Sequence, residues 1–101
     1  VSDDGSSDDT PNILHRYKAD IGDRLSLFQG PGQGFAANFL SMTAKDTIVA
    51  DYFAFCDQDD LWHTDKLERA VAWLKQCPNH IPALYCSRTR LVSAQGNPRG
   101  S

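Results

Sequence analysis

The sequence predicts one α/β domain spanning residues 1–101, in which a mainly parallel sheet is flanked by helices. Strand-like and helix-like segments alternate along the chain, and residues 52–56, Tyr-Phe-Ala-Phe-Cys, are apolar without interruption. A strand that is apolar on both faces is typical of the centre of a parallel sheet covered by helices. The length of 101 residues is enough for one domain with a single hydrophobic core but not comfortably for two.

The first elements are predicted from turn and capping signals. Residues 1–2 suit the end of a strand, and the acidic, turn-rich loop 3–9 follows. Thr10 before Pro11 is typical of a helix N-cap followed by proline at the first helical position. We therefore expect a helix from Thr10, with right-handed crossover to the next strand.

The middle of the chain continues the alternation. Residues 24–29 alternate in part between polar and apolar and suit a short strand, and the glycines of 30–34 indicate a tight turn. Residues 35–44 predict a helix that carries Phe35, Phe39 and Met42 on one face.

The second half adds a strand, a helix and a last strand. The apolar segment 52–56 is followed by Thr64, which can cap a helix that ends before Pro78. Residues 81–92 then predict one further strand, and Gln-Gly-Asn-Pro at 95–98 indicates a turn.

Charge and composition narrow the classes of function. The net charge is −3 and no cluster of basic residues is present, which argues against a nucleic-acid-binding surface. Aspartate supplies every acidic residue except Glu68. Because aspartate favours turns, caps and compact cation sites, this bias points to loops with a chemical role.

The first residue, the lack of long apolar runs and the cysteines indicate where the protein is located. The first residue is Val1, so we expect an incomplete fragment of a longer protein. No apolar run approaches the roughly 18–20 residues of a membrane span. Cys56, Cys77 and Cys86 are odd in number and lack CxxC spacing, which favours reduced thiols. We expect a cytoplasmic location, including the inner face of the cell membrane.

Two acidic loops follow predicted strands. One is residues 2–6, Ser-Asp-Asp-Gly-Ser, and the other is residues 57–60, Asp-Gln-Asp-Asp. Ligands of open α/β sheets bind outside the carboxyl ends of the strands. If both strands are parallel, the two loops lie on the same rim of the sheet, and their convergence would form a binding site.

The carboxylates of residues 57–60 predict a cation site. Three carboxylates within four residues repel one another, and a hard Mg²⁺ or Mn²⁺ ion would relieve that repulsion. Such ions take one or two protein carboxylates and complete their shell with water and phosphate oxygens. We therefore expect Asp57 and Asp59 to hold a metal–diphosphate group. For Asp60, a structural role in helix capping or an Asx turn is as well supported as a place in the metal site.

Other motifs fit less well. An EF-hand loop counted from Asp57 would need glycine where Trp62 stands. A phosphatase with an aspartate nucleophile would carry threonine where Leu61 stands. That phosphatase remains an alternative, and so does a non-catalytic module that binds a metal or a nucleotide.

Taken together, three segments resemble glycosyltransferase family 2, the inverting enzymes of the GT-A fold: residues 1–6 (VSDDGS), 30–38 (GPGQGFAAN) and 53–62 (FAFCDQDDLW), the last followed by Lys66 and Leu67. The motif CDQDDLW and the segment 84–88 look most like the corresponding segments of rhamnosyltransferase members. The resemblance covers essentially the whole chain and implies a GT-A-like, Rossmann-like sheet.

The resemblance also implies roles for individual residues. Asp3 or Asp4 would contact the pyrimidine base or ribose, and Asn38 would belong to the nucleotide-binding set. Asp57 would approach the ribose or sugar, and Asp59 would be the principal ligand of Mg²⁺ or Mn²⁺. The implied partners are a nucleotide-diphospho-sugar donor, with dTDP-rhamnose as one candidate, and a polysaccharide, glycan or lipid-linked glycan acceptor.

Two departures limit what this piece is expected to do alone. Many relatives carry a basic residue just before the matched Asn38, where this chain has Ala37. Inverting family members take their general base from an acidic residue in a later segment, and no acidic residue follows Glu68. We expect donor binding by these residues and no transfer by them alone.

Overall fold

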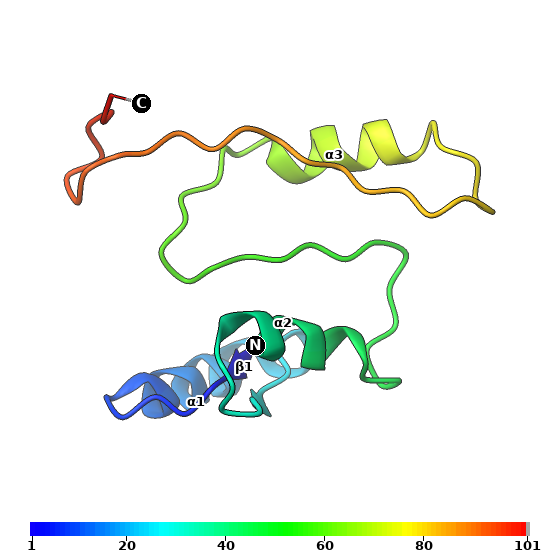
Figure 1. The fold of residues 1–101 in the computed structure, drawn as a ribbon. Coiled ribbons are helices and arrows are strands. Elements are labelled where there is room, and N and C mark those ends of the chain that lie inside the picture. Colours follow the sequence, from blue (N-terminus) through cyan, green and yellow to red (C-terminus); the bar gives the residue numbers. More distant parts are fainter. Residues whose placement is uncertain (101) are drawn as a thin grey trace. The chain divides into compact units, whose positions relative to one another are not determined.

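The computed structural model describes residues 1–100 and divides the chain into two compact units, Val1–Phe55 and Cys56–Ser101. The first unit contains strand β1 (Ser2–Asp3), helix α1 (Thr10–Ile21), the 3₁₀ turn η1 (Gly22–Arg24), strand β2 (Phe28–Gln29) and helix α2 (Phe35–Thr43), and the second contains helix α3 (Lys66–Leu74) (Figure 1). Within residues 1–100, no helix is both long and apolar enough to cross a membrane.

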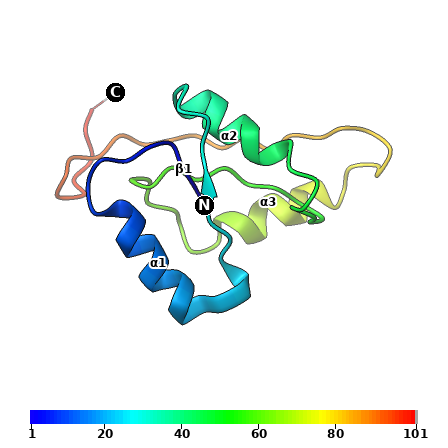
Figure 2. The ribbon, with the colours of Figure 1, turned by 90° about the horizontal axis from the view of Figure 1, so that it is seen from below.

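The first unit is built on a parallel pair of strands. β1 and β2 pair in parallel, with Ser2 opposite Phe28 and Asp3 opposite Gln29. The N–H of Gly30 donates to the carbonyl of Asp3 at 2.7 Å and extends the pairing by one residue. Helix α1 connects the two strands, as Figure 2 shows from below. The predicted α/β class and the parallel pairing are confirmed.

Helix α1 begins where its sequence signals predicted. Thr10 is its first residue rather than its cap, and Asp9 occupies the capping position with Pro11 in the first turn. At the other end, the ammonium of Lys18 donates to the carbonyls of Gly22 and Leu25, at 2.9 and 2.6 Å. Carbonyls at a helix end lack partners inside the helix, so Lys18 fixes the turn that leads to β2.

Helix α2 is confirmed at Phe35–Thr43, but its packing is looser than predicted. Phe39 meets Phe55 edge to face, with ring centroids 5.2 Å apart, whereas Phe35 is 79% exposed. Among residues 1–100 no side chain is fully enclosed, so the single buried core that the sequence predicted is not formed.

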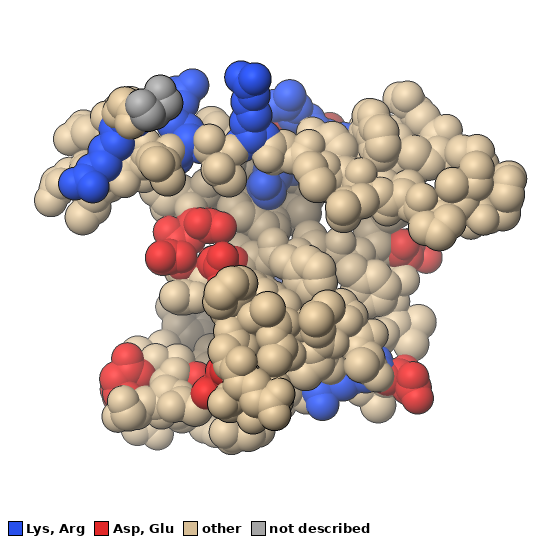
Figure 3. Space-filling view, in the orientation of Figure 1, with Lys and Arg blue, Asp and Glu red and all other residues tan. Residues whose placement is uncertain are grey.

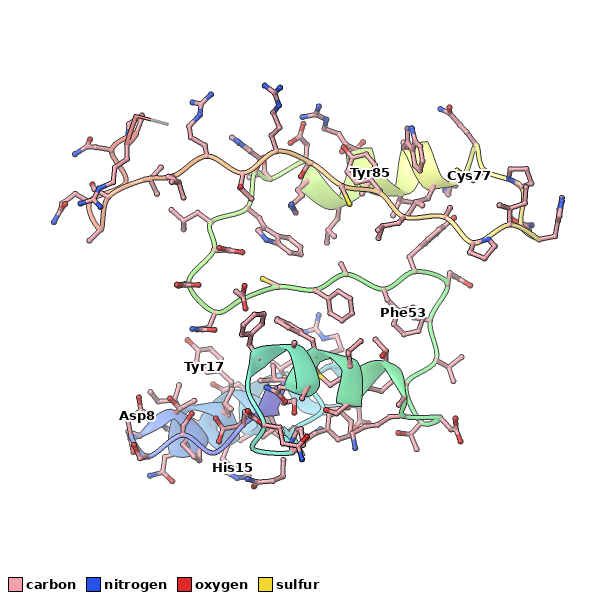
Figure 4. The ribbon with its side chains drawn as sticks, in the orientation of Figure 1. Asp8, His15, Tyr17, Phe53, Cys77 and Tyr85 are labelled. Atoms are coloured by element: carbon pink, nitrogen blue, oxygen red, sulfur yellow. The ribbon has the colours of Figure 1, made fainter. Side chains whose placement is uncertain are left out.

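The predicted strand at residues 52–56 is not formed in this structure, which is the largest difference from the sequence prediction. This segment was predicted as a buried central strand, yet it is extended and unpaired, and Phe53 is 59% exposed (Figure 4). Cys56, the last residue of this segment, is exposed as well. Apolar sequence favours burial, but a parallel strand forms only where a neighbouring strand supplies hydrogen bonds. The sheet of the described residues has two strands, β1 and β2.

The second unit consists of α3 and a segment that returns along it. α3 begins at Lys66 with Asp65 before it, so Thr64 is not its cap. The rings of Trp73 and Tyr85 lie 5.8 Å apart, and Figure 4 shows Tyr85 on the returning segment beside α3. This ring contact holds the returning segment against α3.

The predicted strand 81–92 is also wrong. Residues 82–90 are extended without a paired neighbour, and among the described residues Val92 forms one isolated antiparallel bridge with Pro98. The bridge closes the turn at 95–98, which was predicted correctly. The reason is the same as for residues 52–56: the backbone is extended, but no neighbouring strand supplies the hydrogen bonds that a paired strand needs.

Candidate functional site

Asp4 joins the loop after β1 to the glycine-rich turn before α2. Its Oδ1 accepts a hydrogen bond from the N–H of Gly32 at 2.6 Å, and its Oδ2 accepts one from the N–H of Gly34 at 3.1 Å. The two donors lie 28 and 30 residues further along the chain, in the turn that leads into α2. One carboxylate therefore holds together the first and second of the three segments that carry the resemblance.

Gly30 allows this close approach. A Cβ atom at residue 30 would lie 2.5 Å from Oδ1 of Asp4, 2.5 Å from Oδ1 of Asn38 and 3.0 Å from Cα of Asp4. Atoms that are not bonded to one another do not approach so closely without displacement. The position requires glycine because of the space available, and not because of its backbone angles.

Asn38 connects α2 to β1. Its Nδ2 donates to the backbone carbonyl of Ser2 at 3.0 Å, and its Oδ1 accepts from the Ser2 hydroxyl at 2.6 Å. The side chain is half-buried, and both ends of its amide are engaged. The structure thus places Asn38 beside the β1 loop, where the sequence predicted a nucleotide-binding residue; nucleotide contact itself stays a prediction.

The carboxylate of Asp3 makes only local contacts. Its carboxylate accepts hydrogen bonds from the backbone N–H of Ser6, at 3.2 Å, and from the Ser6 hydroxyl. These bonds shape the loop that follows β1, but they do not join it to another element. A carboxylate has about four acceptor sites, so Asp3 keeps capacity for a ligand.

The second acidic loop is open to solvent. Asp57, Asp59 and Asp60 are exposed, and Figure 3 shows red acidic atoms gathered where Figure 1 draws the loop 57–60. Within the described part of the chain their carboxylates take part in no hydrogen bond or ion pair. The backbone carbonyl of Asp57 accepts from the N–H of Asp60 at 3.5 Å and from the thiol of Cys56 at 3.3 Å. The capping role considered for Asp60 has no support here.

The donors of this loop suit a hard cation, although no ready-made cage is present. In residues 1–100, no group of three or more His, Cys, Asp or Glu side chains is arranged to hold a metal ion. Magnesium-type sites need only one or two protein carboxylates when phosphates complete the shell. The donor chemistry of Asp57 and Asp59 therefore fits a metal that arrives with a diphosphate.

Lys66 organises the residues that follow this loop. Its ammonium lies 5.1 Å from the centroid of the Trp62 ring and 3.3 Å from the hydroxyl of Ser87. The first contact is a cation–π interaction. It accounts for Trp62 as a packing residue of the second unit.

A shallow hollow elsewhere is not the candidate site. Its walls all come from one face of α1: Ile13, Arg16, Tyr17 and Asp20. None of the loops discussed above contributes to it.

Sequence reasoning missed the structural parts played by Gly30 and Ser2. Gly30 was interpreted only as a turn residue, and the Ser2 hydroxyl was not considered. A signal was present for Gly30, because a glycine directly after a strand often marks a close approach of backbone. The partner of Ser2 lies 36 residues away, and no local pattern identifies it.

Comparison with known proteins gives a consistent picture. Residues 1–90 match the model of glycosyl transferase family 2. A dTDP-rhamnosyl transferase of Shigella flexneri, RfbG, is 31% identical over 77 residues, which cover 70% of this chain and 26% of that protein.

Two further relatives are described as uncharacterised glycosyltransferases. That of Rickettsia typhi is 31% identical over 85% of this chain and 25% of its own length, and that of a Nostoc species is 33% identical over 70% and 21%. The chain thus spans about a quarter of the length of the curated relatives it matches. No solved structure gives a significant match.

Proposed function

The chain belongs to glycosyl transferase family 2, and on that premise we propose that it is the donor-binding part of an inverting glycosyltransferase that uses a nucleotide-diphospho-sugar. The match over residues 1–90 carries this proposal. Further support comes from the joined β1 loop and glycine-rich turn, and from the solvent-open carboxylates of residues 57–60.

The first unit supplies recognition of the nucleoside in this proposal. A carboxylate of the β1 loop, from Asp3 or Asp4, accepts a hydrogen bond from the pyrimidine base or the ribose. Asn38 supports the same loop through its two bonds to Ser2. Because these contacts are made before any ligand arrives, little ordering of the loop is needed on binding.

The second unit supplies the metal ligands. Asp59 is the principal ligand of Mg²⁺ or Mn²⁺, and Asp57 contributes to the same ion or to the ribose. The metal, when bound, neutralises the diphosphate and stabilises its charge as the sugar departs. The aspartates hold the ion while leaving most of its coordination positions to phosphate oxygens and water.

The sheet is proposed to be larger in the intact protein. A GT-A-like sheet would include residues 52–56 as a paired strand, which would bury the rings of Phe53 and Phe55. Their present exposures, 59% and 54%, leave a large apolar surface that a neighbouring strand and helix could cover.

The donor is proposed to be dTDP-rhamnose, on the strength of the Shigella relative, whose name states that activity. The acceptor is proposed to be a polysaccharide or a lipid-linked glycan. The general base would come from outside these residues, since no acidic side chain follows Glu68.

Thermal unfolding of the intact protein tests the proposal. With dTDP at a hundredfold excess over its dissociation constant and Mn²⁺ present, binding should stabilise the folded state by about 2.7 kcal/mol. The rise in melting temperature should require both components. It should be lost in Asp59→Asn, because the amide removes the charge that attracts the cation.

Asp51→Asn provides the matched control, because Asp51 is an exposed aspartate just before the apolar segment. It should respond to dTDP and Mn²⁺ as the wild type does. An equal loss in Asp51→Asn and Asp59→Asn would contradict a specific metal site. Phosphorylation of Asp57 by a phosphoryl donor would indicate a phosphatase instead.

A further inference from the structure

The glycine-rich turn of this chain has the form of a phosphate-binding loop, but its amides are already engaged. Glycine-rich turns before a helix commonly bind phosphate through backbone N–H groups and the helix N-terminus. Here the N–H groups of Gly32 and Gly34 both donate to Asp4. Each N–H has one proton to donate, so neither is available to a phosphate oxygen.

Asp4 also supplies the negative charge that the N-terminus of helix α2 lacks in its own sequence. α2 has no acidic residue in its first turn, and its N-cap, Gly34, provides no side-chain cap. A carboxylate at this end is favourable, because the helix N-terminus carries a partial positive charge. A diphosphate brought to the same place would meet a carboxylate of like charge.

The arrangement leaves the two aspartates of the β1 loop with different tasks. The carboxylate bonds of Asp4 span 28 and 30 residues and join two segments, whereas those of the Asp3 carboxylate reach only Ser6, three residues away. The space beside Gly30 is filled by Asp4 and Asn38, which keeps Asp4 against the turn. Removing Asp4 would release the turn, and removing Asp3 would not.

We propose that Asp4 is a positioning residue that occupies the amides of the glycine-rich turn and fixes the β1 loop against α2, leaving Asp3 as the aspartate of this loop that meets the nucleotide. The proposal rests on the proposed function for the identity of the ligand, but the anchoring of the turn is independent of it. The diphosphate is then held through the metal and not by the turn.

Two measurements on the intact protein test this assignment. Hydrogen exchange of residues 30–34 reports on the anchor without any ligand, and calorimetric titration with dTDP and Mn²⁺ reports on the nucleotide. Asp4→Asn should speed exchange in 30–34 and raise the dissociation constant about tenfold or more, the size expected for a lost charged hydrogen bond. The number of binding sites should stay the same.

Three variants complete the design. Asp4→Glu keeps the charge but displaces it by one methylene, so it should behave as Asp4→Asn does. Asp3→Asn should weaken dTDP binding without changing exchange in 30–34. Asp46→Asn, at an exposed turn, should change neither measurement.

The outcomes separate the alternatives. Unchanged hydrogen exchange of residues 30–34 in Asp4→Asn would overturn the anchoring role. A fall in the number of dTDP-binding sites at an unchanged dissociation constant would also overturn it, because that result indicates misfolding only. Chemical-shift changes at Gly32 and Gly34 on adding pyrophosphate without metal would also overturn it. If the wild type binds no dTDP while exchange still responds to Asp4→Asn, the anchor stands and the proposed function fails.

Discussion

At the scale of single residues, a few side chains account for the order of the first unit. A Cβ atom at residue 30 would lie 2.5 Å from Oδ1 of Asp4 and 2.5 Å from Oδ1 of Asn38, so these two side chains limit what residue 30 can be. The carboxylate and the amide fill the space where a larger residue 30 would place its Cβ. Their hydrogen bonds link segments that are far apart in the sequence, so each substitution should affect both segments.

Replacing Gly30 tests this crowding. In Gly30→Ala the methyl group would force Asp4 and Asn38 to move, and overpacking of this kind costs about 1–3 kcal/mol. The free energy of unfolding of the intact protein, measured by chemical denaturation, should fall by that amount. Gly100→Ala is the control, because a Cβ at residue 100 meets no atom within 4 Å. Equal stability of the two variants would show that the turn accommodates a side chain.

At the scale of elements, the start of α1 shows how a helix end is secured from the preceding loop. Thr10 donates to Asp8 from its hydroxyl and from its backbone N–H, the latter at 3.0 Å. These bonds favour the charged carboxylate and hold the pKa of Asp8 below its ordinary value. Asp9 adds a bond from Asn12 and an ion pair with Arg16, at 3.6 Å.

The lowered pKa of Asp8 has a consequence for pH dependence. Because the folded pKa lies below the unfolded one, the contribution to stability is present above the unfolded pKa and is lost as pH falls through the folded pKa. Thr10→Val removes the hydroxyl and should move the Asp8 titration midpoint upward, as measured by NMR of the carboxyl carbon. Thr47→Val should leave it unchanged, and an unmoved midpoint in Thr10→Val would contradict the hydroxyl's role.

At the scale of the whole molecule, the two units differ in what holds them. The first has a parallel strand pair and hydrogen bonds between distant segments. The second relies on side-chain contacts between α3 and the segment that returns along it.

The predicted meeting of the two acidic loops, residues 2–6 and 57–60, at one sheet edge stays a prediction. Broadening of Asp3 and Asp4 resonances by Mn²⁺ bound with dTDP would support it.

The proposed larger sheet has its own test in the intact protein. If residues 52–56 pair as a central strand, their backbone N–H groups are hydrogen-bonded on both sides and should exchange slowly with solvent. Residues 57–59 are exposed and their backbone N–H groups donate no hydrogen bond in the structure, so they should exchange fast and provide the comparison within the same protein. Exchange at 52–56 as fast as at 57–59 would argue against a GT-A-like sheet.

The sequence alone determined the features that depend on nearby residues. The three helices follow from apolar spacing and from signals such as Pro11 and Pro78, and the pairs of aspartates with the glycine-rich turn identified the family. Local pattern is sufficient there because helix hydrogen bonds join residues four apart.

Only the tertiary structure decided which residues become paired strands and which loop residues hold one another. Residues 52–56 and 81–92 have strand-like composition but no partner, since strand pairing depends on distant backbone. Hydrogen bonds join Asp4 to Gly32 and Gly34, and Asn38 to Ser2. These residues are 28 to 36 positions apart in the sequence. Such contacts leave no periodic trace in the sequence, because they depend on how the chain returns to itself.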